Sequence, residues 1–545
     1  MEGSDRMATK PRKPAIISAM TQSAPQGNKQ IARAAGVVMA GMALSSIAGL
    51  LTNMLVSNAF GTSSEVDAFY AANRVTEIMF NLMAGGALAS AFVPTFTEFL
   101  ARKNRPGAWK LASSIGNWVL LLLTASAVLV FLAAEWLVPN VFAPGFEDPV
   151  QIQLTVRLLR EMLPAPVIFG VSGLLMGILN AQQHFALPAL APASYRFGWI
   201  VGVLVLVPRF GIDGLAWGVV LGAGLHLIIQ LPALRRNGGP YSLSLGFKNP
   251  AVKQVGVLMA PRLIGVAVVQ LNFLVNTILA SGQPEGSLTA ITWGFALMIM
   301  PQTVIAQGIA IAALPTFSEQ AAREELSDMR KSFSTTIGWI LYLTLPASVG
   351  LILLREPLIA MLFERGAFTA YSTSQVAWAL LWYAAGLIGH SILEIIVRAF
   401  YAMKDTYTPV LVGAGAMSLN VGLSFAFSAL FKMVGWMPHG GLALANSTAT
   451  ALESLLLLFL LRKKLGGLNF KQLVRPAAGM FTAAAVMGAV LWLLVGSGGG
   501  LASWIVSAAG VLGGGGLYYG ITRLFRLKES VEVPDLFLQR IFRHR

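Results

Sequence analysis

The 545-residue chain contains no cysteine and few charged residues. Without cysteine it can form no disulfide, no thiolate metal site and no cysteine nucleophile. Asp, Glu, Lys and Arg make up 12% of the chain, whereas soluble domains carry about 25%. Together with a hydrophobic content of 56%, this shortage of charge argues against a water-soluble enzyme.

Acidic residues are scarcer than basic ones, with 24 Asp and Glu against 39 Lys and Arg, a formal net charge of +15. A basic patch on a folded surface would indicate nucleic-acid binding, but these basic residues form short clusters between long apolar runs. The clusters alternate with connectors that are poor in Lys and Arg. By the positive-inside rule, basic connectors such as 102–105, 235–248 and 462–464 are cytoplasmic. We therefore expect both termini in the cytoplasm and no nucleic-acid partner.

Catalytic motifs are also missing from the sequence. It has no Walker-type GxxxxGK[ST] loop, no HExxH and no GxSxG, the patterns that would indicate nucleotide hydrolysis, zinc proteolysis or a serine nucleophile. The five histidines are scattered without the spacing of metal ligands. We expect a transporter rather than an enzyme, without a cofactor or a metal site.

Long apolar stretches dominate what remains. A helix needs roughly 20 residues to cross the hydrocarbon core, and about fourteen stretches of this length are present. The fold class predicted is an all-α polytopic membrane protein. The expected spans are 33–60, 68–98, 112–140, 158–180, 187–208, 212–233, 254–281, 287–315, 334–354, 374–402, 409–431, 440–461, 474–496 and 501–522.

The two tails differ in character. The first thirty residues are polar and basic and lack the apolar core of a signal peptide, so we expect no cleavage there. The C-terminal tail mixes apolar side chains with charges, which suits either an amphipathic segment on the anionic inner leaflet or a solvated tail.

An internal duplication organises the spans. Pro94-Thr95-Phe96-Thr97-Glu98 recurs as Pro315-Thr316-Phe317-Ser318-Glu319, a shift of 221 residues, and Gly214-Leu215-Ala216 recurs as Gly441-Leu442-Ala443 at a shift of 227. The duplication predicts two six-helix lobes with the same membrane orientation. As in transporters built from parallel repeats, we expect a cavity between the two lobes. The expected division is a basic tail (1–30), an N-terminal lobe (31–240), a C-terminal lobe (249–466), two added helices (470–523) and a tail (524–545).

Ionisable residues within the spans are candidates for function because each costs roughly 2.5 to 3.5 kcal/mol to insert. Arg74 and Glu77 lie three apart and can pair on one helix face, either as a structural pair or facing a cavity. Arg262 follows Pro261, which should kink its helix, and is either a phosphate ligand or an arginine that reaches the membrane surface. Glu453 has no partner nearby in the sequence.

Other intramembrane residues favour packing roles. Glu394 and Arg398, four apart in the acid-first order, are interpreted as a structural pair. Arg196 is as ambiguous as Arg262, and His226 is interpreted as a hydrogen-bonded packing residue.

Several motifs resemble one family. Leu362-Phe363-Glu364-Arg365-Gly366-Ala367-Phe368-Thr369, the segment Arg398 to Pro409 and Asp67-Ala68-Phe69 are very similar to the lipid II flippase family, MurJ or MviN, and the resemblance extends over about residues 33–522. It implies the multidrug/oligosaccharidyl-lipid/polysaccharide exporter fold, with two six-helix lobes and two added helices beside a groove for a lipid tail. It also implies a monomer in the bacterial inner membrane that exports lipid-linked peptidoglycan precursor by alternating access.

The sequence departs from the family at positions expected to be basic, where it has Ser46, Thr52, Phe80 and Ala296. The residues expected to line the substrate cavity, against the isoprenoid-pyrophosphate-linked glycan and membrane lipids, are Arg74, Arg262, Asn53, Ser46, Thr52 and Asn81. Those considered for an ion site or polar relay are Asn276, Asn420, Ser424, Asn446, Glu77 and Glu453. Because neutral oxygens replace the carboxylates that some relatives use for sodium, the driving force is either sodium or, more simply, the membrane potential.

Three alternatives remain open from the sequence. The missing basic residues are compatible with another lipid-linked oligosaccharide as cargo. A small-molecule exporter coupled to protons or sodium would use Glu77 or Glu453. A membrane scaffold without transport would need none of these residues.

Overall fold

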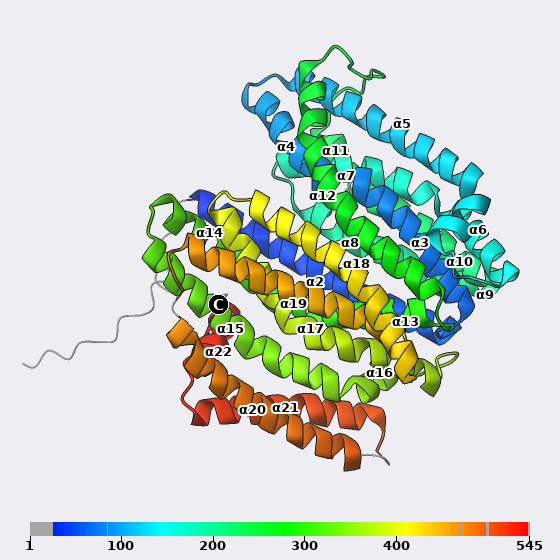
Figure 1. Ribbon diagram of the computed structural model, residues 1–545. Helices are drawn as coiled ribbons and strands as arrows, with labels where there is room; N and C mark the ends of the chain where they lie inside the picture. Colours follow the sequence, from blue (N-terminus) through cyan, green and yellow to red (C-terminus); the bar gives the residue numbers. More distant parts are fainter. Residues whose placement is uncertain (1–25, 84–85, 469, 498–500, 543–545) are drawn as a thin grey trace, which may run out of the picture.

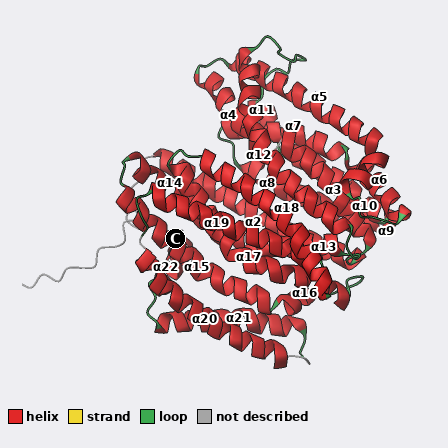
Figure 2. Ribbon diagram, viewed as in Figure 1, coloured by secondary structure: helices red, strands yellow, loops and turns green. Residues whose placement is uncertain are grey.

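The computed structural model describes residues 26–83, 86–468, 470–497 and 501–542, and these segments form helices and loops without a β-strand (Figure 2). The first half contains α2 (Gln26–Phe60), α3 (Ser64–Met83), α4 (Gly86–Ala101), α5 (Arg105–Leu137), η1 (Val138–Phe142), α6 (Pro149–Met162), α7 (Pro164–Ala181), α8 (Ala186–Val201), η2 (Gly202–Leu206), α9 (Val207–Phe210), α10 (Ile212–Ile228) and α11 (Leu231–Asn237). The second half contains α12 (Pro250–Ser281), α13 (Ser287–Pro301), η3 (Gln302–Gln307), α14 (Gly308–Ala322), α15 (Leu326–Leu353), α16 (Arg355–Phe363), α17 (Ala370–Ala402), α18 (Tyr407–Val434), α19 (His439–Lys464), α20 (Phe470–Ser497), α21 (Ser503–Leu524) and α22 (Glu529–Phe542).

In the part of the chain that the structure describes, thirteen of the fourteen predicted membrane spans are present as long apolar helices. Within the described residues, twelve helices are long and apolar enough to cross a membrane, and α12, bent by 46° between Ala260 and Gly265, makes a thirteenth. The bend lies where Pro261 was expected to kink the helix. The second predicted span corresponds to α3 and α4 together, and α3 is less apolar because it carries two acidic residues in its first turn. The all-α polytopic fold is therefore confirmed.

Polar side chains start several helices by satisfying free backbone N–H groups. The side chains of Asn104, Asp148 and Asn249 accept hydrogen bonds from Gly107 N, Val150 N and Ala251 N at the starts of α5, α6 and α12. Each of these caps is followed by a proline in the first turn, where the missing N–H costs nothing. These short sequences thus set where the long apolar helices begin.

The duplication is visible in the helix boundaries. Helices α4 and α14 end at Ala101 and Ala322, and α7 and α17 end at Ala181 and Ala402, each pair 221 residues apart. The shift becomes 227 at the starts of α10 and α19, as expected from the Gly-Leu-Ala match. Even the left-handed residues of the turns repeat, with Lys103 matching Glu324. The two halves are copies of one unit.

Close packing within the N-terminal lobe depends on small residues. Helices α8 and α10 pack against one another, and a Cβ on Gly198 would lie 2.2 Å from the Cα of Gly222. In a membrane, where burial of apolar surface drives little association, such close backbone approach is a main source of helix packing. The cores of the two lobes are otherwise filled by buried Phe, Leu, Ala and Trp side chains.

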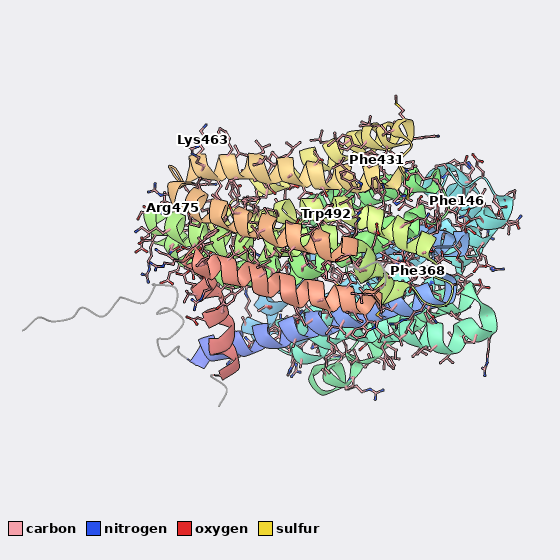
Figure 3. The ribbon with its side chains drawn as sticks, turned by 90° about the horizontal axis from the view of Figure 1, so that it is seen from below. Phe146, Phe368, Phe431, Lys463, Arg475 and Trp492 are labelled. Atoms are coloured by element: carbon pink, nitrogen blue, oxygen red, sulfur yellow. The ribbon has the colours of Figure 1, made fainter. Side chains whose placement is uncertain are left out.

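The lobes meet at one end of the molecule and diverge at the other (Figure 1). Helices α3 and α13 pack together at the end that carries the α2–α3 turn, which we call the closed end. At the opposite end, α4 and α11 of the first lobe lie apart from α14 of the second. Figure 3 places Lys463 and Arg475 at this second end, which we call the basic end, and Phe146 and Phe368 at the closed end.

Candidate functional site

Two carboxylates hold the closed end together across the lobes. The side chain of Asp67, in the first turn of α3, accepts hydrogen bonds from Gly286 N at 2.8 Å, Thr289 N at 2.8 Å and the Thr289 hydroxyl at 2.6 Å, at the start of α13. In return, Glu285 accepts a 2.6 Å hydrogen bond from Ser64 N at the start of α3. Each lobe therefore caps the exposed N–H groups of the other lobe's helix, where the helix dipole also favours negative charge.

Further hydrogen bonds join the lobes beside these reciprocal caps. The Thr62 hydroxyl lies 2.8 Å from the Ser372 hydroxyl and 2.9 Å from Gln375 Oε1. Trp293 Nε1 donates to the Tyr70 hydroxyl at 2.6 Å. These groups are buried, so opening the closed end would break several satisfied hydrogen bonds together.

Arg74 lies at the contact between the lobes, in the middle of α3. It is ten residues into α3, about 15 Å from the start of the helix at 1.5 Å per residue. Its Nη1 donates to Glu77 Oε2 at 2.6 Å, while Asn73 donates to Glu77 Oε1 at 2.9 Å. The predicted pair of Arg74 and Glu77 is thus present, and a second donor holds the carboxylate.

The guanidinium of Arg74 is only partly used by this pair. It lies over the ring of Phe273 on α12, 5.1 Å from the ring centroid, so it contacts the second lobe. Its Nε is buried without a hydrogen-bond partner among the described residues. An arginine fixed by one carboxylate and one aromatic ring, with an N–H left over, is suited to bind an anionic oxygen.

A second arginine, Arg196 on α8, lies in the same region. Its guanidinium stacks on Tyr195 and Trp199, with distances of 5.7 and 5.4 Å to the ring centroids. Trp199 in turn packs edge-on against Phe69 of α3, with ring centroids 5.3 Å apart, and Phe69 packs against Tyr70. The sequence left this arginine ambiguous, because no charged residue accompanies it on its own helix. Only the packing of α8 against α2 and against Phe69 of α3 locates it.

The neutral residues expected in the substrate cavity fall into two groups. The hydroxyls of Ser46 and Thr52 donate to Met42 O and Ala48 O on their own helix. Thr52 is fully buried, so in this conformation it is packed inside the protein and is not exposed in a cavity. Asn53 and Asn81 are half-buried, without a hydrogen bond to another described residue.

Arg262 lies within the bend of α12. Its side chain is exposed, and none of the described acidic residues forms an ion pair with it. It is not brought into contact with Arg74, so its role as a phosphate ligand stays a prediction.

The residues considered for an ion site form a chain of neutral groups between α12 and α18. Asn420 donates to Asn272 Oδ1 at 3.0 Å, and the Ser424 hydroxyl donates to Asn276 Oδ1 at 3.3 Å. Among the described residues no group of three His, Cys, Asp or Glu side chains is close enough to hold a metal ion. The arrangement satisfies buried amides with one another and offers no carboxylate to a cation.

The remaining candidates on α17 and α19 are separate from this chain. Asn446 Oδ1 accepts a 3.1 Å hydrogen bond from His390 Nε2. Glu453 is buried on α19, where its carboxyl lies near Gly413 and has no hydrogen-bond partner among the described residues. The structure thus brings Arg74 and Glu77 together, and it keeps Asn446 and Glu453 apart from them.

Two packing interpretations from the sequence agree with the structure. His226 Nδ1 lies 2.6 Å from the Ser172 hydroxyl in the buried core of the first lobe. Glu394 pairs with Arg398 and also accepts hydrogen bonds from Gln302 and Gln307, the first and last residues of η3. The reciprocal caps of Asp67 and Glu285 were not predicted from the sequence. Asp67 lies in the first turn of α3 and Glu285 just before α13, and because these helices occupy equivalent places in the two repeats, acidic caps could have been sought at their starts.

Comparisons with known proteins agree on one family. The family model for lipid II flippase MurJ matches residues 56–506. The lipid II flippase MurJ of Burkholderia cenocepacia is 30% identical over 431 residues, covering 77% of this chain and 82% of that protein. The probable lipid II flippase MurJ of Rhizobium tropici is 30% identical over 484 residues, covering 86% and 88%.

Solved structures show the same fold. A lipid II flippase MurJ in an inward closed conformation superposes with a TM-score of 0.76 at 24% identity, covering 90% of this chain and 98% of that one. An inward-facing multidrug resistance transporter of the MATE family in the MOP superfamily gives a TM-score of 0.63 at 15% identity, covering 77% and 94%. The chain therefore belongs to the MurJ family and is a multi-pass transport protein of the bacterial inner membrane.

Proposed function

We propose that this protein translocates lipid II, the lipid-linked peptidoglycan precursor, across the inner membrane by alternating access. The family match over residues 56–506 and the relatives named as lipid II flippases support this substrate. The observation within the chain that carries the proposal is Arg74, which lies between the lobes in the middle of α3 with an unpartnered N–H. The protein moves this substrate without converting it chemically.

Recognition of the pyrophosphate rests on two arginines. Arg74 keeps Nη1 on Glu77 and can offer its remaining N–H groups to a phosphate oxygen, as a charge-assisted hydrogen bond. Arg196, stacked on two aromatic rings, adds a second positive charge to the same region. With Glu77 included, the formal charge of the three groups is +1, which attracts a pyrophosphate without holding it too tightly for release.

The orientation follows from the distribution of charge. If the basic end faces the cytoplasm, as the positive-inside rule indicates, both termini are cytoplasmic and the closed end faces outward. The divergence of the lobes at the basic end (Figure 1) then suits loading of the substrate from the cytoplasmic leaflet. Release outward requires the reciprocal caps of Asp67 and Glu285 to break. We expect one chain to suffice, with lipids and no nucleic acid as partners.

The membrane potential can drive this movement. Two negative charges that cross the whole field outward release about 4.6 kcal/mol per 100 mV, from about 2.3 kcal/mol per charge. The neutral Asn and Ser chain between α12 and α18 contains no carboxylate for sodium. We therefore propose that transport is driven by the potential and needs no bound cation.

Growth of cells that depend on this protein tests the proposal. The chain is expressed in bacteria depleted of their own lipid II flippase, and its membrane insertion is checked by immunoblotting of isolated membranes. We expect restored growth with the wild-type chain. Lysis despite normal insertion would contradict the assignment of lipid II as the substrate.

A further inference from the structure

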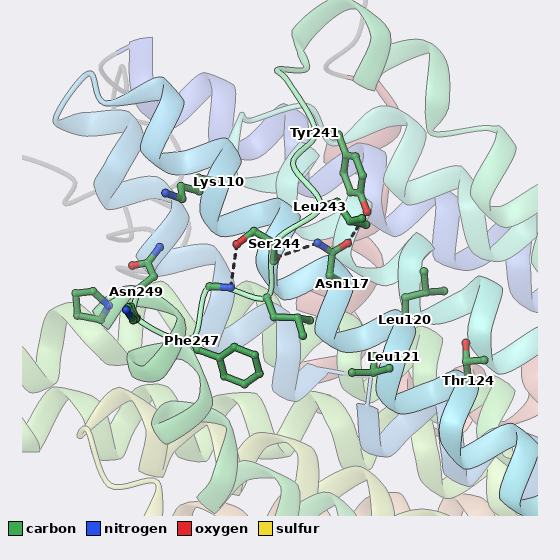
Figure 4. A pocket seen from close by; sticks show the side chains of 14 residues that line it. Lys110, Asn117, Leu120, Leu121, Thr124, Tyr241, Leu243, Ser244, Phe247 and Asn249 are labelled. Carbon is green, nitrogen blue, oxygen red and sulfur yellow. Dashed lines mark hydrogen bonds between the residues drawn. The ribbon is translucent and has the colours of Figure 1, made fainter.

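A large groove lies far from the contact between the lobes, at the basic end of the first lobe. It has a volume of about 1130 Å³ and is open to the surface. It is lined by α5 and by residues 238–249, the segment between α11 and α12, which we call the linker. This volume is slightly above the range of about 300 to 1,000 Å³ that is usual for ligand sites. Figure 4 shows Lys110 at one end of the groove, and Leu120, Leu121 and Thr124 further along α5.

The linker wall of the groove is held in place by hydrogen bonds to α5. Asn117 donates to Ser242 O at 3.1 Å and to Ser244 O at 2.9 Å, and Trp118 donates to Leu245 O at 2.9 Å. Tyr241 in turn donates to Asn117 Oδ1 at 2.5 Å. The groove is thus formed before any ligand arrives, which reduces the entropic cost of binding.

One glycine lets the linker approach α5 closely. Gly246 has a φ of +62°, and a Cβ there would lie 2.7 Å from the Ser114 hydroxyl. Beyond this turn, Phe247 stacks edge-on against Trp118 with ring centroids 5.3 Å apart. Phe247 and Leu243 are nevertheless 75% and 89% exposed. Large apolar side chains that stay exposed on a firmly held segment suit a surface that contacts lipid.

The charges at the groove have no acidic counterpart. Lys110 and Lys248 line it, and both are exposed and form no ion pair within the described residues. Neither of the two segments that form the groove, 105–125 and 238–253, contains an Asp or Glu. The site therefore attracts an anion.

The groove changes from charged to apolar in the direction of the membrane. Lys110 lies in the second turn of α5, and Leu121 and Thr124 follow eleven and fourteen residues later, about 16 to 21 Å deeper at 1.5 Å per residue. Leu120 and Leu121 are 44% and 49% exposed and line the groove. A phospholipid has the same order of groups, with a charged phosphate that would lie near the lysines and an apolar acyl chain that would lie along the leucines.

We propose that this groove binds an anionic phospholipid, with its phosphate between Lys110 and Lys248 and an acyl chain along Leu120 and Leu121. Charge complementarity selects this occupant over a zwitterionic lipid. The site is distinct from the Arg74 region. A lipid there would bridge α5 to the linker that joins the two lobes.

Native mass spectrometry of the purified full-length protein tests the proposal, with phosphatidylglycerol and phosphatidylcholine as probes. We expect preferential retention of phosphatidylglycerol. The double variant K110Q/K248Q should weaken this retention by about ten- to thirty-fold, since each basic residue near a charged membrane surface contributes about fivefold or slightly less. K463Q/R475Q, which removes two charges from the same end but from α19 and α20 (Figure 3), is the matched control and should change retention less than twofold.

A third variant separates a lipid from a free anion. Thr124→Trp fills the apolar part of the groove without touching the lysines, and it should reduce phosphatidylglycerol retention as well. Equal retention by K110Q/K248Q and the wild-type chain would overturn the proposal. So would normal retention by Thr124→Trp together with competition by inorganic phosphate, which would indicate an anion site that takes no lipid.

Discussion

The reciprocal caps at the closed end can be weakened by one substitution, Asp67→Ala. The variant loses the three hydrogen bonds that Asp67 accepts from Gly286 and Thr289. At about 1 kcal/mol net for each bond, the closed end loses about 3 kcal/mol relative to the conformation in which it is open to water. This corresponds to about a 150-fold shift in the equilibrium between the closed and the opened conformation. A closed-to-open ratio of 99:1 would become about 2:3.

Distances between spin labels measure this shift, because the chain has no cysteine of its own to label. Cysteines replacing Glu65 and Tyr371, both exposed at the closed end on different lobes, would carry the labels for double electron–electron resonance. We expect a second, longer distance to appear in Asp67→Ala. A label pair at Lys103 and Glu324, in the repeat-related turns of the basic end, should show a shorter one.

Asp148→Ala is the matched control. Asp148 also caps a helix with its carboxylate, but the helix, α6, lies in its own lobe. This variant should lose stability without changing either distance distribution. Unchanged distances in Asp67→Ala would refute the conclusion that the caps hold the two lobes together. The same change in both variants would show that general destabilisation is the cause.

Three further predictions concern packing, pH and coupling. Gly222→Ala should lower the melting temperature, because its Cβ would lie 2.5 Å from Tyr195 O and overpacking costs about 1 to 3 kcal/mol. Gly224→Ala on the same helix has open space around the new Cβ and should leave the melting temperature unchanged. Equal melting temperatures for the two variants would contradict the close packing of α8 and α10. The hydrogen bond from Lys464 lowers the pKa of Asp405 to about 2. Its carboxylate therefore stabilises the fold above about pH 4 and loses this effect as the pH falls toward 2, so Asp405→Asn should melt earlier than wild type at pH 7, with the difference shrinking between pH 4 and pH 2. A constant difference at all pH values would contradict this role. In a vesicle assay at fixed membrane potential, the transport rate should change less than about twofold when sodium is replaced by choline or Glu453 by Gln. The reason is that the potential alone supplies the driving force. Loss of transport in either case would indicate cation coupling.

Much of the fold could be predicted because hydrophobic length and internal repetition are properties of the sequence alone. The shift of 221 residues between Pro94 and Pro315 predicted the match of helix ends at Ala101 and Ala322. The pair of Arg74 and Glu77 could be predicted for a similar reason, since residues three apart lie on one face of a helix.

Contacts between the lobes could not be predicted in this way. Asp67 and Gly286 are 219 residues apart, and no local spacing reveals which acid reaches which helix start. Thr52 shows the same difficulty, because its position in the family pattern indicated a cavity, whereas the packing of α2 against α8 buries it. Arg196 was undecided until its stacking on Tyr195 and Trp199, and the packing of Trp199 against Phe69, located it beside α3.

Translocation of lipid II by the purified protein in liposomes tests the proposed function most directly. The fraction of lipid II headgroups accessible from outside is followed over time for the wild-type chain, Arg74→Ala and Arg102→Ala. Arg102 is the control because it forms a similar ion pair with Glu98 on the surface of the basic end. We expect wild type and Arg102→Ala to translocate lipid II equally fast and Arg74→Ala to be at least about tenfold slower, since a hydrogen bond to a charged group contributes about 1.5 to 3 kcal/mol. No translocation by the correctly inserted wild-type protein would contradict the flippase function, and an undiminished rate in Arg74→Ala would contradict the assigned site.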